Sequence, residues 1–487
     1  MYKHVTQEEA LNDPEGVIID VRWVIVNKGT KEKPQVRCRL VGREFAEKGN
    51  RDDLFAGTPP LVTIRLLLSI LAKRYCYESD VAAMVIDVKG AFLYGKTKRK
   101  VYIWLPEEDP KSAEGYMGKL EKAMYGTRDA PQVWQEEVRK TMEDLGFEEC
   151  VTQPGIYHHK EKRVQVVSHV DDFLCIGRVG ELEWFRDNLK RRYEIKSQIL
   201  NAGSPTVSFL GRRITWTDQG LEVEADPKHV DILLKEWKME ECKACDTPTG
   251  NDEVGGGAPM TANEATLFRR AAARVNYLGQ DRPDLNVASR LLAMRMAQPK
   301  KGDEGILKRV LRYLKGHPRS VYKYEWNAGE GELELYTDSD WAGDREERKS
   351  ASGGVIMHGG HLIGHWSKLQ NSPAPSSGEA ELNAGSKGLS EMLGVRHLLV
   401  QLGMIVRMKH YLDASAAKGT MMRRGAGKIK HLEVRQLWCQ HAVSKYDIEI
   451  VKIPRAQNLA DNLTHPVGRR NLELFLEAIG VDIRGEP

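Results

Sequence analysis

Hydrophobic and polar positions in the first half of the chain follow helical spacing in some segments and strand-like spacing in others. Apolar residues three and four apart predict helices over 62–75, 131–147 and 181–195. Short runs rich in β-branched residues predict strands over 37–45 and 82–88. The pattern therefore predicts a mixture of helices and strands in this half.

The second half of the chain changes its pattern twice. Residues 263–317 show helical spacing throughout, whereas residues from 331 onward follow the order β–β–β–α–β–α–β–α. That order predicts a mixed sheet with helices on its faces, so the expected fold class is α+β. Between the two parts, 247–262 is rich in Gly, Pro and Thr and lacks apolar periodicity, which predicts a flexible linker or loop.

Composition limits the class of protein. At 487 residues, with 41% hydrophobic and 29% charged positions, the chain is too long for one ordinary domain and too apolar for a disordered protein. The formal net charge is only +4, but basic runs such as 308–319 and 421–431 suit either solvated surface or nucleic acid. No apolar run reaches the ~20 residues of a membrane span, and Arg65 interrupts LVTIRLLLSILA. We therefore expect an intracellular protein without a membrane partner.

The seven cysteines show no disulfide-scaffold spacing, which indicates a reducing compartment. Cys242 and Cys245 form one CxxC. A zinc site needs a second pair, and none lies nearby in the sequence, so we do not expect zinc.

Three aspartates form the first candidate site. Strand-like runs flank Asp171 and Asp172, which predicts a hairpin with the pair at its bend, although strands avoid Asp and neighbouring carboxylates repel each other. Asp87 lies near the end of another strand-like run, MVIDV, and could converge on the pair. Carboxylates that close need cations between them, and Mg²⁺ is the natural partner. A polar turn beside an unrelated Asp explains the same residues equally well.

Nine segments, in this order, resemble the reverse transcriptases of copia-type retrotransposons: LVGREF, TIRLLLS, IDVKGAFLYG, AMYGTRDAPQVW, SHVDDFL, FLGRRI, RVLRYLKG, TDSDWAGD and LADNLTHP. The resemblance implies a right-hand polymerase of fingers, palm and thumb, followed by a ribonuclease H-like domain. It implies fingers and palm over 1–225, a helical thumb or connection over 226–328, and the ribonuclease H-like domain over 329–487. It also implies that the three aspartates bind the catalytic metal ions.

Three further residues take expected roles from their position within this resemblance. Phe92 matches the steric gate that excludes the 2′-OH of ribonucleotides, with core packing as the alternative. Arg37 and Arg39 match a basic fingers segment that contacts the incoming triphosphate.

Other matches and departures concern the same site. Residues 209–211 (Phe-Leu-Gly) match the segment that holds the primer end, and Lys196 falls where polymerases often place a proton donor to pyrophosphate. His169 stands where the family usually has Tyr, and Asp129 stands where a Gln normally supports the dNTP. A carboxylate near a triphosphate is unfavourable unless Arg128 pairs with it, so Asp129 argues against full polymerase activity.

Four carboxylates on different predicted elements form the second candidate site: Asp338, Glu381, Asp413 and Asp461. Strand ends and helix starts on one side of a sheet can gather such groups around two metals, although each acid alone suits a cap or a surface position. Their segments resemble those of the ribonuclease H domain that follows copia-type polymerases. His431 also matches a family position, and Asp340 is a weaker candidate ligand.

The resemblance thus implies an RNA-directed DNA polymerase with ribonuclease H activity, the C-terminal part of an LTR-retrotransposon polyprotein. Each active site would hold two Mg²⁺, with Mn²⁺ as a substitute. The partners would be an RNA template, a DNA primer, an RNA–DNA hybrid and dNTPs, together with capsid and integrase of the same element, in cytoplasmic virus-like particles with access to the nucleus. The alternative is a decayed or host-retained copy that binds nucleic acid without polymerising.

Overall fold

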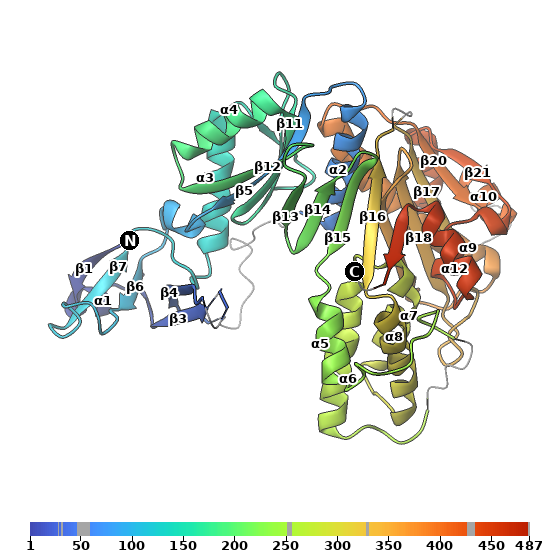
Figure 1. Ribbon diagram of the computed structural model, residues 1–487, viewed down its shortest axis with the longest axis horizontal. Coiled ribbons are helices and arrows are strands. Elements are labelled where there is room, and N and C mark those ends of the chain that lie inside the picture. The colour runs from blue at the N-terminus through green and yellow to red at the C-terminus, as the bar shows by residue number, and fades with distance from the viewer. Residues whose placement is uncertain are drawn as a thin grey trace. The chain divides into compact units, whose positions relative to one another are not determined.

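The computed structural model describes residues 1–27, 29–30, 33–45, 59–250, 256–327, 331–425 and 434–485. The chain divides into two compact units. The first comprises Met1–Pro60 and Ala83–Gln198, and the second comprises Leu61–Ala82 and Ile199–Pro487. Helices, antiparallel strands and parallel strands all occur, which confirms the α+β class (Figure 1). The compact units do not coincide with the three predicted domains, whose boundaries stay a prediction.

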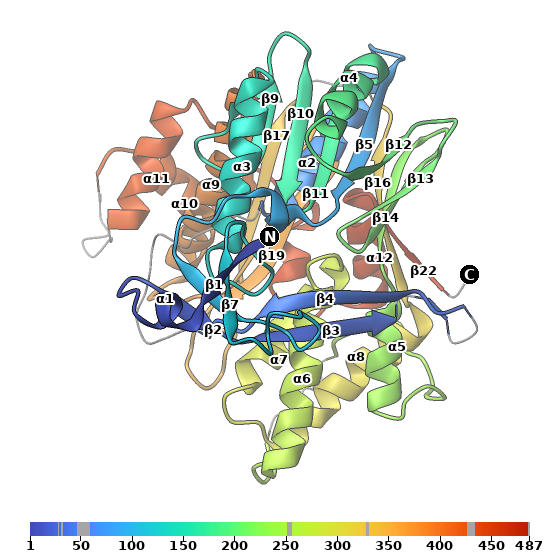
Figure 2. The ribbon, with the colours of Figure 1, turned by 90° about the vertical axis from the view of Figure 1, so that its left-hand side faces the viewer.

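The first unit begins with two small sheets, of which the hydrophobic pattern predicted one strand, over 37–45, that the structure confirms as β4 (Val36–Gly42). One sheet has four strands in the order β1 (Tyr2–Thr6), β7 (Tyr116–Leu120), β6 (Val101–Trp104) and β2 (Val17–Ile19). A separate two-stranded ribbon pairs β3 (Val21–Asn27) with β4 (Val36–Gly42), as Figure 2 shows. Trp23 and Ile25 are exposed on it. Since an isolated pair of strands is only marginally stable in water, this ribbon depends on its neighbours.

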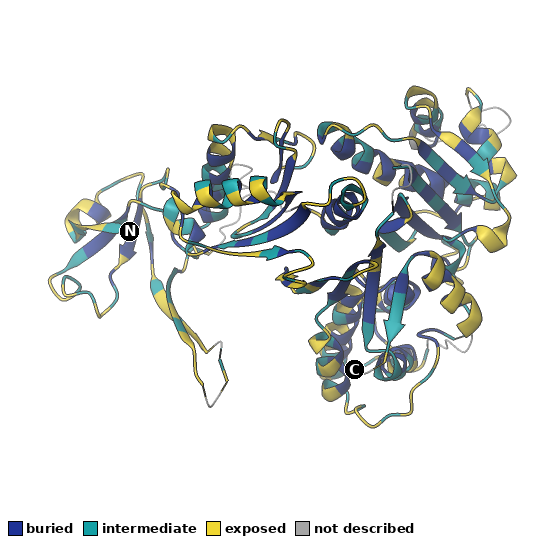
Figure 3. Cartoon of the chain, turned by 45° about the horizontal axis from the view of Figure 1, so that its top comes forward, coloured by how far each residue is buried: buried dark blue, intermediate teal, exposed yellow. Residues whose placement is uncertain are grey.

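A six-stranded sheet forms the rest of the first unit. Its order is β12 (Ile195–Leu200), β5 (Val81–Val88), β11 (Asp172–Arg178), β10 (Val164–His169), β9 (Ile156–His159) and β8 (Glu148–Glu149). The helices of this part are α3 (Ala130–Asp144) and α4 (Val179–Lys190). Most of β5 is buried on both faces, which explains its nearly continuous apolar run. In Figure 3 the buried positions follow the strands, and the exposed positions lie on the outer helix faces.

The second unit contains an antiparallel sheet whose strands come from distant parts of the chain. The order is β13 (Thr206–Phe209), β14 (Arg212–Trp216), β15 (Gly220–Ala225), β16 (Arg319–Glu325) and β22 (Val481–Arg484). Between β15 and β16 lie the helices α5 (Lys228–Glu236), α6 (Ala262–Leu278), α7 (Asn286–Arg295) and α8 (Glu304–Gly316). These helices confirm the helical prediction for 263–317. Pairing of β22 with β16 ties the end of the described chain back to this sheet.

The second sheet of this unit has the mixed topology that the sequence predicted. Its order is β19 (His361–Leu369), β18 (Ala351–His358), β17 (Leu333–Ser339), β20 (Met408–Leu412) and β21 (Glu449–Lys452). Strands β17, β18 and β19 are antiparallel, whereas β17, β20 and β21 run parallel. The accompanying helices are α9 (Ser377–Gln401), α10 (Ser415–Met422), α11 (Val434–Lys445) and α12 (Arg469–Ala478). This is a ribonuclease H-like arrangement. It confirms the predicted order of elements except that α10 is an additional helix between β20 and α11, and β22 follows α12.

Helix α2 (Leu61–Tyr75) belongs to this second unit and is buried along most of its length. Arg65, the charge inside its apolar run, donates to Asp281 and to the Tyr322 hydroxyl. Ser69, one turn further on, hydrogen-bonds to Nδ1 of His358 (2.7 Å) and of His361 (2.9 Å). A buried polar group is costly unless it is paired, and here each has its partner on a different segment. Within the described residues, no helix has the length and apolarity that crossing a bilayer requires.

The seam between Ser69 and the two histidines predicts sensitivity to acid. Burial lowers the pKa of His358 to about 3 and of His361 to about 4. Below the ordinary His pKa of ~6.5, the unfolded chain therefore binds protons that the folded chain does not. The free energy of unfolding should fall by about 2 kcal/mol for each histidine between pH 7.5 and pH 5.0. Urea unfolding at the two pH values, followed by circular dichroism, measures this loss.

The matched variant is His358→Asn, which keeps a hydrogen-bonding group near the position of Nδ1 but does not titrate. It should be less stable than the wild type at pH 7.5. It should also lose about 2 kcal/mol less than the wild type on acidification, because one titrating site is gone. Equal pH dependence in the two proteins would contradict the assignment.

Candidate active sites

The first acid set lies in the first unit, where β5 and β11 are neighbours in the six-stranded sheet. Asp87 is the last residue but one of β5, and Asp172 is the first residue of β11. The Val88 N–H donates to the Asp171 carbonyl at 2.8 Å, which holds the hairpin bend against the end of β5. The predicted hairpin is confirmed, because β10 and β11 pair with His169 opposite Asp172.

The bend that carries Asp171 is strained. Its other central residue, Val170, has a φ of 57°, which is unusual for a β-branched side chain. The Trp134 indole N–H donates to the Val170 carbonyl at 2.6 Å and secures the bend. Strain of this kind persists only where the surroundings over-determine it, and it clusters at functional sites.

The charges at this bend favour a bound cation. Burial, and then the negative charges of Asp171 and Asp87, raise the pKa of Asp172 to about 6. A carboxyl group that is hard to ionise beside two other carboxylates fits a position facing a divalent cation with oxygen ligands. Lys196 is exposed on β12, and its predicted role as a proton donor is not tested.

An aromatic and basic wall accompanies the three aspartates. The Arg39 guanidinium lies 4.8 Å from the centre of the Tyr125 ring, and the Phe92 ring centre lies 4.8 Å from the same ring. Arg37, Arg39, Asp87 and Asp171 all act on the pKa of Tyr125, which burial raises. The predicted fingers arginines are therefore close in space to the predicted metal ligands. Phe92 is half-buried and packs against a small apolar cluster, so its ring also serves the core.

The side chain of Asp129 does not pair with Arg128, the partner that the sequence analysis considered. Its side chain pairs with Arg99 (Nη2 to Oδ1, 2.7 Å), which also binds Glu44 through two hydrogen bonds. Only the backbone N–H of Arg128 takes part, and it donates to Glu44 at 2.8 Å. Although burial acts to raise it, the hydrogen bond from Arg99 lowers the pKa of Asp129. The negative charge that argued against polymerase activity is thus partly offset by Arg99, which shares its single positive charge between Asp129 and Glu44.

The motif residues 209–211 form the turn of the β13–β14 hairpin in the second unit. Leu210 and Gly211 both have positive φ (47° and 72°), as in the tight turns that suit hairpins. Arg212 donates to the Leu210 carbonyl at 2.9 Å and to both carboxylate oxygens of Asp281, which fixes the turn. The predicted role at the primer end is not tested.

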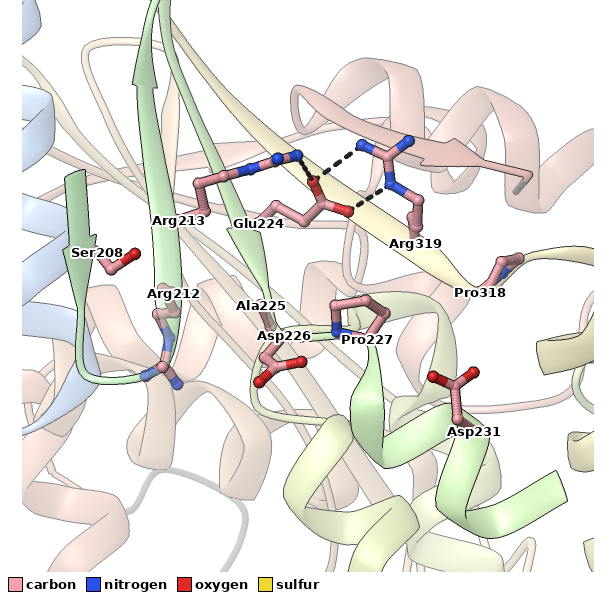
Figure 4. Close-up of a pocket in the computed structure, with 11 residues that line it drawn as sticks. Ser208, Arg212, Arg213, Glu224, Ala225, Asp226, Pro227, Asp231, Pro318 and Arg319 are labelled. Atoms are coloured by element: carbon pink, nitrogen blue, oxygen red, sulfur yellow. Dashed lines mark hydrogen bonds and ion pairs between the residues drawn. The ribbon is translucent and has the colours of Figure 1, made fainter. Parts of the chain in front are cut away.

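A cavity of about 600 Å³ adjoins this hairpin. Figure 4 shows its charged residues, of which Glu224 accepts hydrogen bonds from Arg213 (2.8 Å) and from Arg319. These side chains neutralise one another, so the cavity offers little net charge to an anionic ligand.

The second acid set lies at one edge of the mixed sheet. Tyr336 of β17 lies beside Tyr411 of the parallel strand β20, so Asp338 and Asp413 follow at the same edge. Glu381 approaches from α9, and the Ser339 N–H donates to its Oε1 at 3.2 Å. Ligand atoms of these three carboxylates all lie within 4.8 Å of one another.

Burial dominates the electrostatics of this group. Burial, and then the charges of Asp338 and Asp413, raise the pKa of Glu381 to about 9. Burial, with smaller contributions from Asp461 and Asp413, raises the pKa of Asp338 to about 7. Oε2 of Glu381 is buried and has no hydrogen-bond partner among the described residues. An orphaned carboxylate oxygen within a tight acidic group fits a divalent cation with oxygen ligands.

The fourth acid, Asp461, lies on a short 3₁₀ turn (Asp461–Leu463) close to the other three but outside their compact group. Thr464, three residues later, donates from Oγ1 to Oδ2 of Asp338 at 2.8 Å. Asn458 donates to the Thr337 carbonyl at 3.0 Å. These two contacts anchor the turn to β17, and neither was predicted from the sequence.

The remaining predicted residues have other positions. Asp340 accepts a hydrogen bond from the Ala351 N–H and does not join the acidic group. Asp413 is not the N-cap of α10, which is Ala414. His431 lies outside the described residues.

Comparison with known proteins places these two sites in context. Residues 10–251 match the family of reverse transcriptases (RNA-dependent DNA polymerases). The retrovirus-related Pol polyprotein from transposon RE1 of Arabidopsis thaliana is 27% identical over an alignment of 479 residues. The alignment covers 95% of this chain and 32% of that protein. This chain belongs to the copia-type reverse transcriptases.

Other relatives of this copia-type reverse transcriptase agree. The Pol polyprotein from transposon TNT 1-94 of Nicotiana tabacum is 27% identical over 486 residues, covering 94% of this chain and 35% of that protein. The chain therefore spans about a third of the length of these relatives. Among solved structures, LC11-RNase H1 isolated from compost is 21% identical over 30% of this chain and 99% of that chain. The TM-score of this structural match is 0.23.

Sequence reasoning overlooked several residues of the copia-type site. Tyr125 lies inside the quoted segment AMYGTRDAPQVW, two residues after its start, and the aromatic residue before a glycine was a usable signal. Gly126 has a φ of 91°, and a Cβ there would lie 2.1 Å from the Gly42 carbonyl oxygen. The close approach of the Tyr125 turn to β4 therefore needs glycine. No pattern in the sequence pointed to Arg99 or Thr464.

The raised pKa of Glu381 predicts the behaviour of Glu381→Gln. A folded carboxyl with a raised pKa binds a proton that the unfolded chain releases, so it lowers stability as pH rises above the ordinary Glu value. Without metal at pH 8, Glu381→Gln should therefore raise the free energy of unfolding by about 1–3 kcal/mol. It should also reduce the gain in melting temperature that Mg²⁺ gives to the wild type.

Glu391→Gln is the matched control, because Glu391 lies on the same helix and, among the described residues, forms its ion pair with Lys387 at the surface. This variant should leave both the stability and the Mg²⁺ response close to those of the wild type. An unchanged Mg²⁺ response in Glu381→Gln would contradict a metal role for Glu381.

Proposed function

We propose that the chain is an RNA-directed DNA polymerase with ribonuclease H activity, acting as part of a longer retrotransposon polyprotein. The observation that carries this proposal is the pair of separate carboxylate sets in a chain of the copia-type family: the pKa of Asp172 is raised in the first set, and those of Asp338 and Glu381 are raised in the second. The predicted template, primer, hybrid, dNTP, capsid and integrase partners, and the location in cytoplasmic particles, belong to the same proposal.

In the polymerase reaction, the primer 3′-oxygen attacks the α-phosphorus of a dNTP as the bond to pyrophosphate breaks. Two Mg²⁺ held by Asp87, Asp171 and Asp172 would stabilise the attacking and leaving oxygens. Arg37 and Arg39 would bind the triphosphate; in support, Arg39 lies over the Tyr125 ring, and both arginines act on the pKa of Tyr125, as do Asp87 and Asp171. Phe92 presents its ring where a ribonucleotide would carry the 2′-OH.

In the ribonuclease reaction, a water oxygen attacks the phosphorus of a phosphodiester in the RNA strand of a hybrid, and the bond from that phosphorus to one ester oxygen breaks. Asp338, Glu381, Asp413 and Asp461 would hold the two Mg²⁺ that supply charge stabilisation for this chemistry. Burial of the first two keeps them from ionising freely until a cation is present, which couples metal binding to the loss of their protons.

A nucleic-acid-binding copy without polymerase activity is the second candidate. His169 favours it, since this residue replaces the usual Tyr beside the aspartate pair, and its Nδ1 is buried without a hydrogen-bond partner among the described residues. The pairing of Asp129 with Arg99 weakens the other argument for it.

Primer extension on an RNA template, with Mg²⁺ and dNTPs, tests the first site. Asp171→Asn/Asp172→Asn should reduce extension on the order of a thousandfold and leave cleavage of the RNA strand in a hybrid unchanged. Asp338→Asn should do the reverse, because the two sets act on different reactions. A wild type that binds the hybrid but shows neither reaction would decide for the second candidate.

Selection of the sugar tests Phe92. Phe92→Val should raise incorporation of ribonucleotides relative to deoxyribonucleotides by at least about tenfold, because the ring no longer occupies the space of the 2′-OH. Single-nucleotide extension with each substrate measures the ratio. A variant that folds and extends with dNTPs but keeps the wild-type ratio would leave Phe92 with a packing role alone.

A further inference from the structure

Arg455 lies beside the second acid set and has no role in the function proposed above. It begins a short 3₁₀ turn (Arg455–Gln457), and its Nε donates to Oδ1 of Asp461 at 2.8 Å. The Arg455 side chain is 68% exposed, whereas that of Asp461 is 20% exposed. The guanidinium of Arg455 therefore pairs with Asp461 while remaining in contact with water.

The segment around Arg455 is fixed to the sheet. Asn458 is buried and ties this segment to the end of β17, and Thr464 ties it to Asp338. The backbone around Arg455 is thus held in place, while the exposed guanidinium can exchange one anionic partner for another.

Asp461, the acid that pairs with Arg455, differs from the other three acids in its position. Asp338, Glu381 and Asp413 form the compact group, and Asp461 is the acid outside it. Burial raises the pKa of Asp338, Glu381 and Asp413, and the positive charge of Arg455 partly offsets the rise in each case. Arg455 therefore lies within electrostatic range of the whole set.

We propose that Arg455 is a substrate-dependent latch: it holds Asp461 away from the metal position in the free protein and transfers to a phosphate of the hybrid when the substrate binds. The transfer releases Asp461 to complete the metal site. This inference rests on the proposed ribonuclease H function and adds the order in which the site is assembled.

The energetics allow such an exchange. An exposed ion pair contributes little to stability, so the contact between Arg455 and Asp461 can be exchanged for another partner. A guanidinium binds a phosphate with two parallel hydrogen bonds, which makes the backbone of a nucleic acid a better partner than a single carboxylate oxygen. His465, whose Nε2 lies 4.0 Å from Oδ2 of Asp461, remains beside the released carboxylate.

The test uses Arg455→Ala and Arg455→Lys in the full-length chain. Arg469→Ala is the matched control, because Arg469 is similarly exposed (63%) and pairs with Glu473 and Asp246 and not with one of the four acids among the described residues. Mn²⁺ binding without nucleic acid is measured by calorimetry, in a background of Asp171→Asn/Asp172→Asn that removes the first site. Binding of a labelled RNA–DNA hybrid is measured by fluorescence anisotropy with Ca²⁺ over a range of salt concentrations.

Arg455→Ala should bind Mn²⁺ more tightly than its parent, by up to about fivefold, because the competitor for Asp461 is gone. The same variant should bind the hybrid more weakly, with a salt slope reduced by about one. Arg455→Lys should keep most of the salt slope but lose part of the affinity for the hybrid, since an ammonium lacks the planar fork. Arg469→Ala should match its parent in both measurements.

Opposite changes in metal and hybrid binding support the latch, because a residue that only stabilised the fold would weaken both. Weaker binding of both, or no change in either, would overturn it. Failure of the proposed function is a separate result: in that case the wild type would neither bind the hybrid in preference to duplex DNA nor cleave its RNA strand.

Discussion

The mutual repulsion of buried carboxylates is the constraint on which the second unit depends. Asp338, Glu381 and Asp413 share a small space, and burial makes their ionised forms expensive. The parallel register of β17 and β20 and the approach of α9 hold them there in spite of that cost. A protein that keeps such an arrangement gives up stability for a site that becomes favourable only with a cation bound.

The first unit also holds neighbouring carboxylates together, but on a strained turn. Asp171 and Asp172 lie at a hairpin bend in which Val170, a β-branched residue, has a positive φ, and the Trp134 indole N–H donates to the Val170 carbonyl. Charge near this site is also partly offset internally. Arg99 pairs with Glu44 and Asp129 together, so its single positive charge offsets part of the negative charge of the two carboxylates.

Buried polar groups inside the second unit are likewise paired. Arg65, Ser69 and the histidines of β18 and β19 are buried, and each is held by a partner from a distant part of the chain. Helix α2 precedes the polymerase strand β5 in sequence, yet these contacts make it part of the unit that carries the ribonuclease H-like sheet. Loss of one partner would leave the other unsatisfied, which is why the seam is sensitive to protonation.

Periodicity alone determined much of the local structure. The helices α2, α3, α6 and α8, the buried strand β5, the hairpin with the paired aspartates and the order of elements after residue 331 all followed from spacing, since that spacing reflects which face is buried. The acids of both sites were candidates from their positions at strand ends and helix starts, and the resemblance to copia-type proteins singled them out. Short strands with little periodicity, such as β1, β2 and β22, escaped notice, since their pairing partners lie far away in sequence.

Only the tertiary structure decided which charges meet. Arg99 is 30 residues from Asp129, Thr464 is 126 residues from Asp338, and Ser69 is 289 residues from His358. Distances of that kind leave no trace in local composition, because any surface arginine or threonine would look the same in the sequence. The chemistry of the acids was therefore visible in the residues themselves, whereas the partners that hold, neutralise and expose those acids were set by the fold.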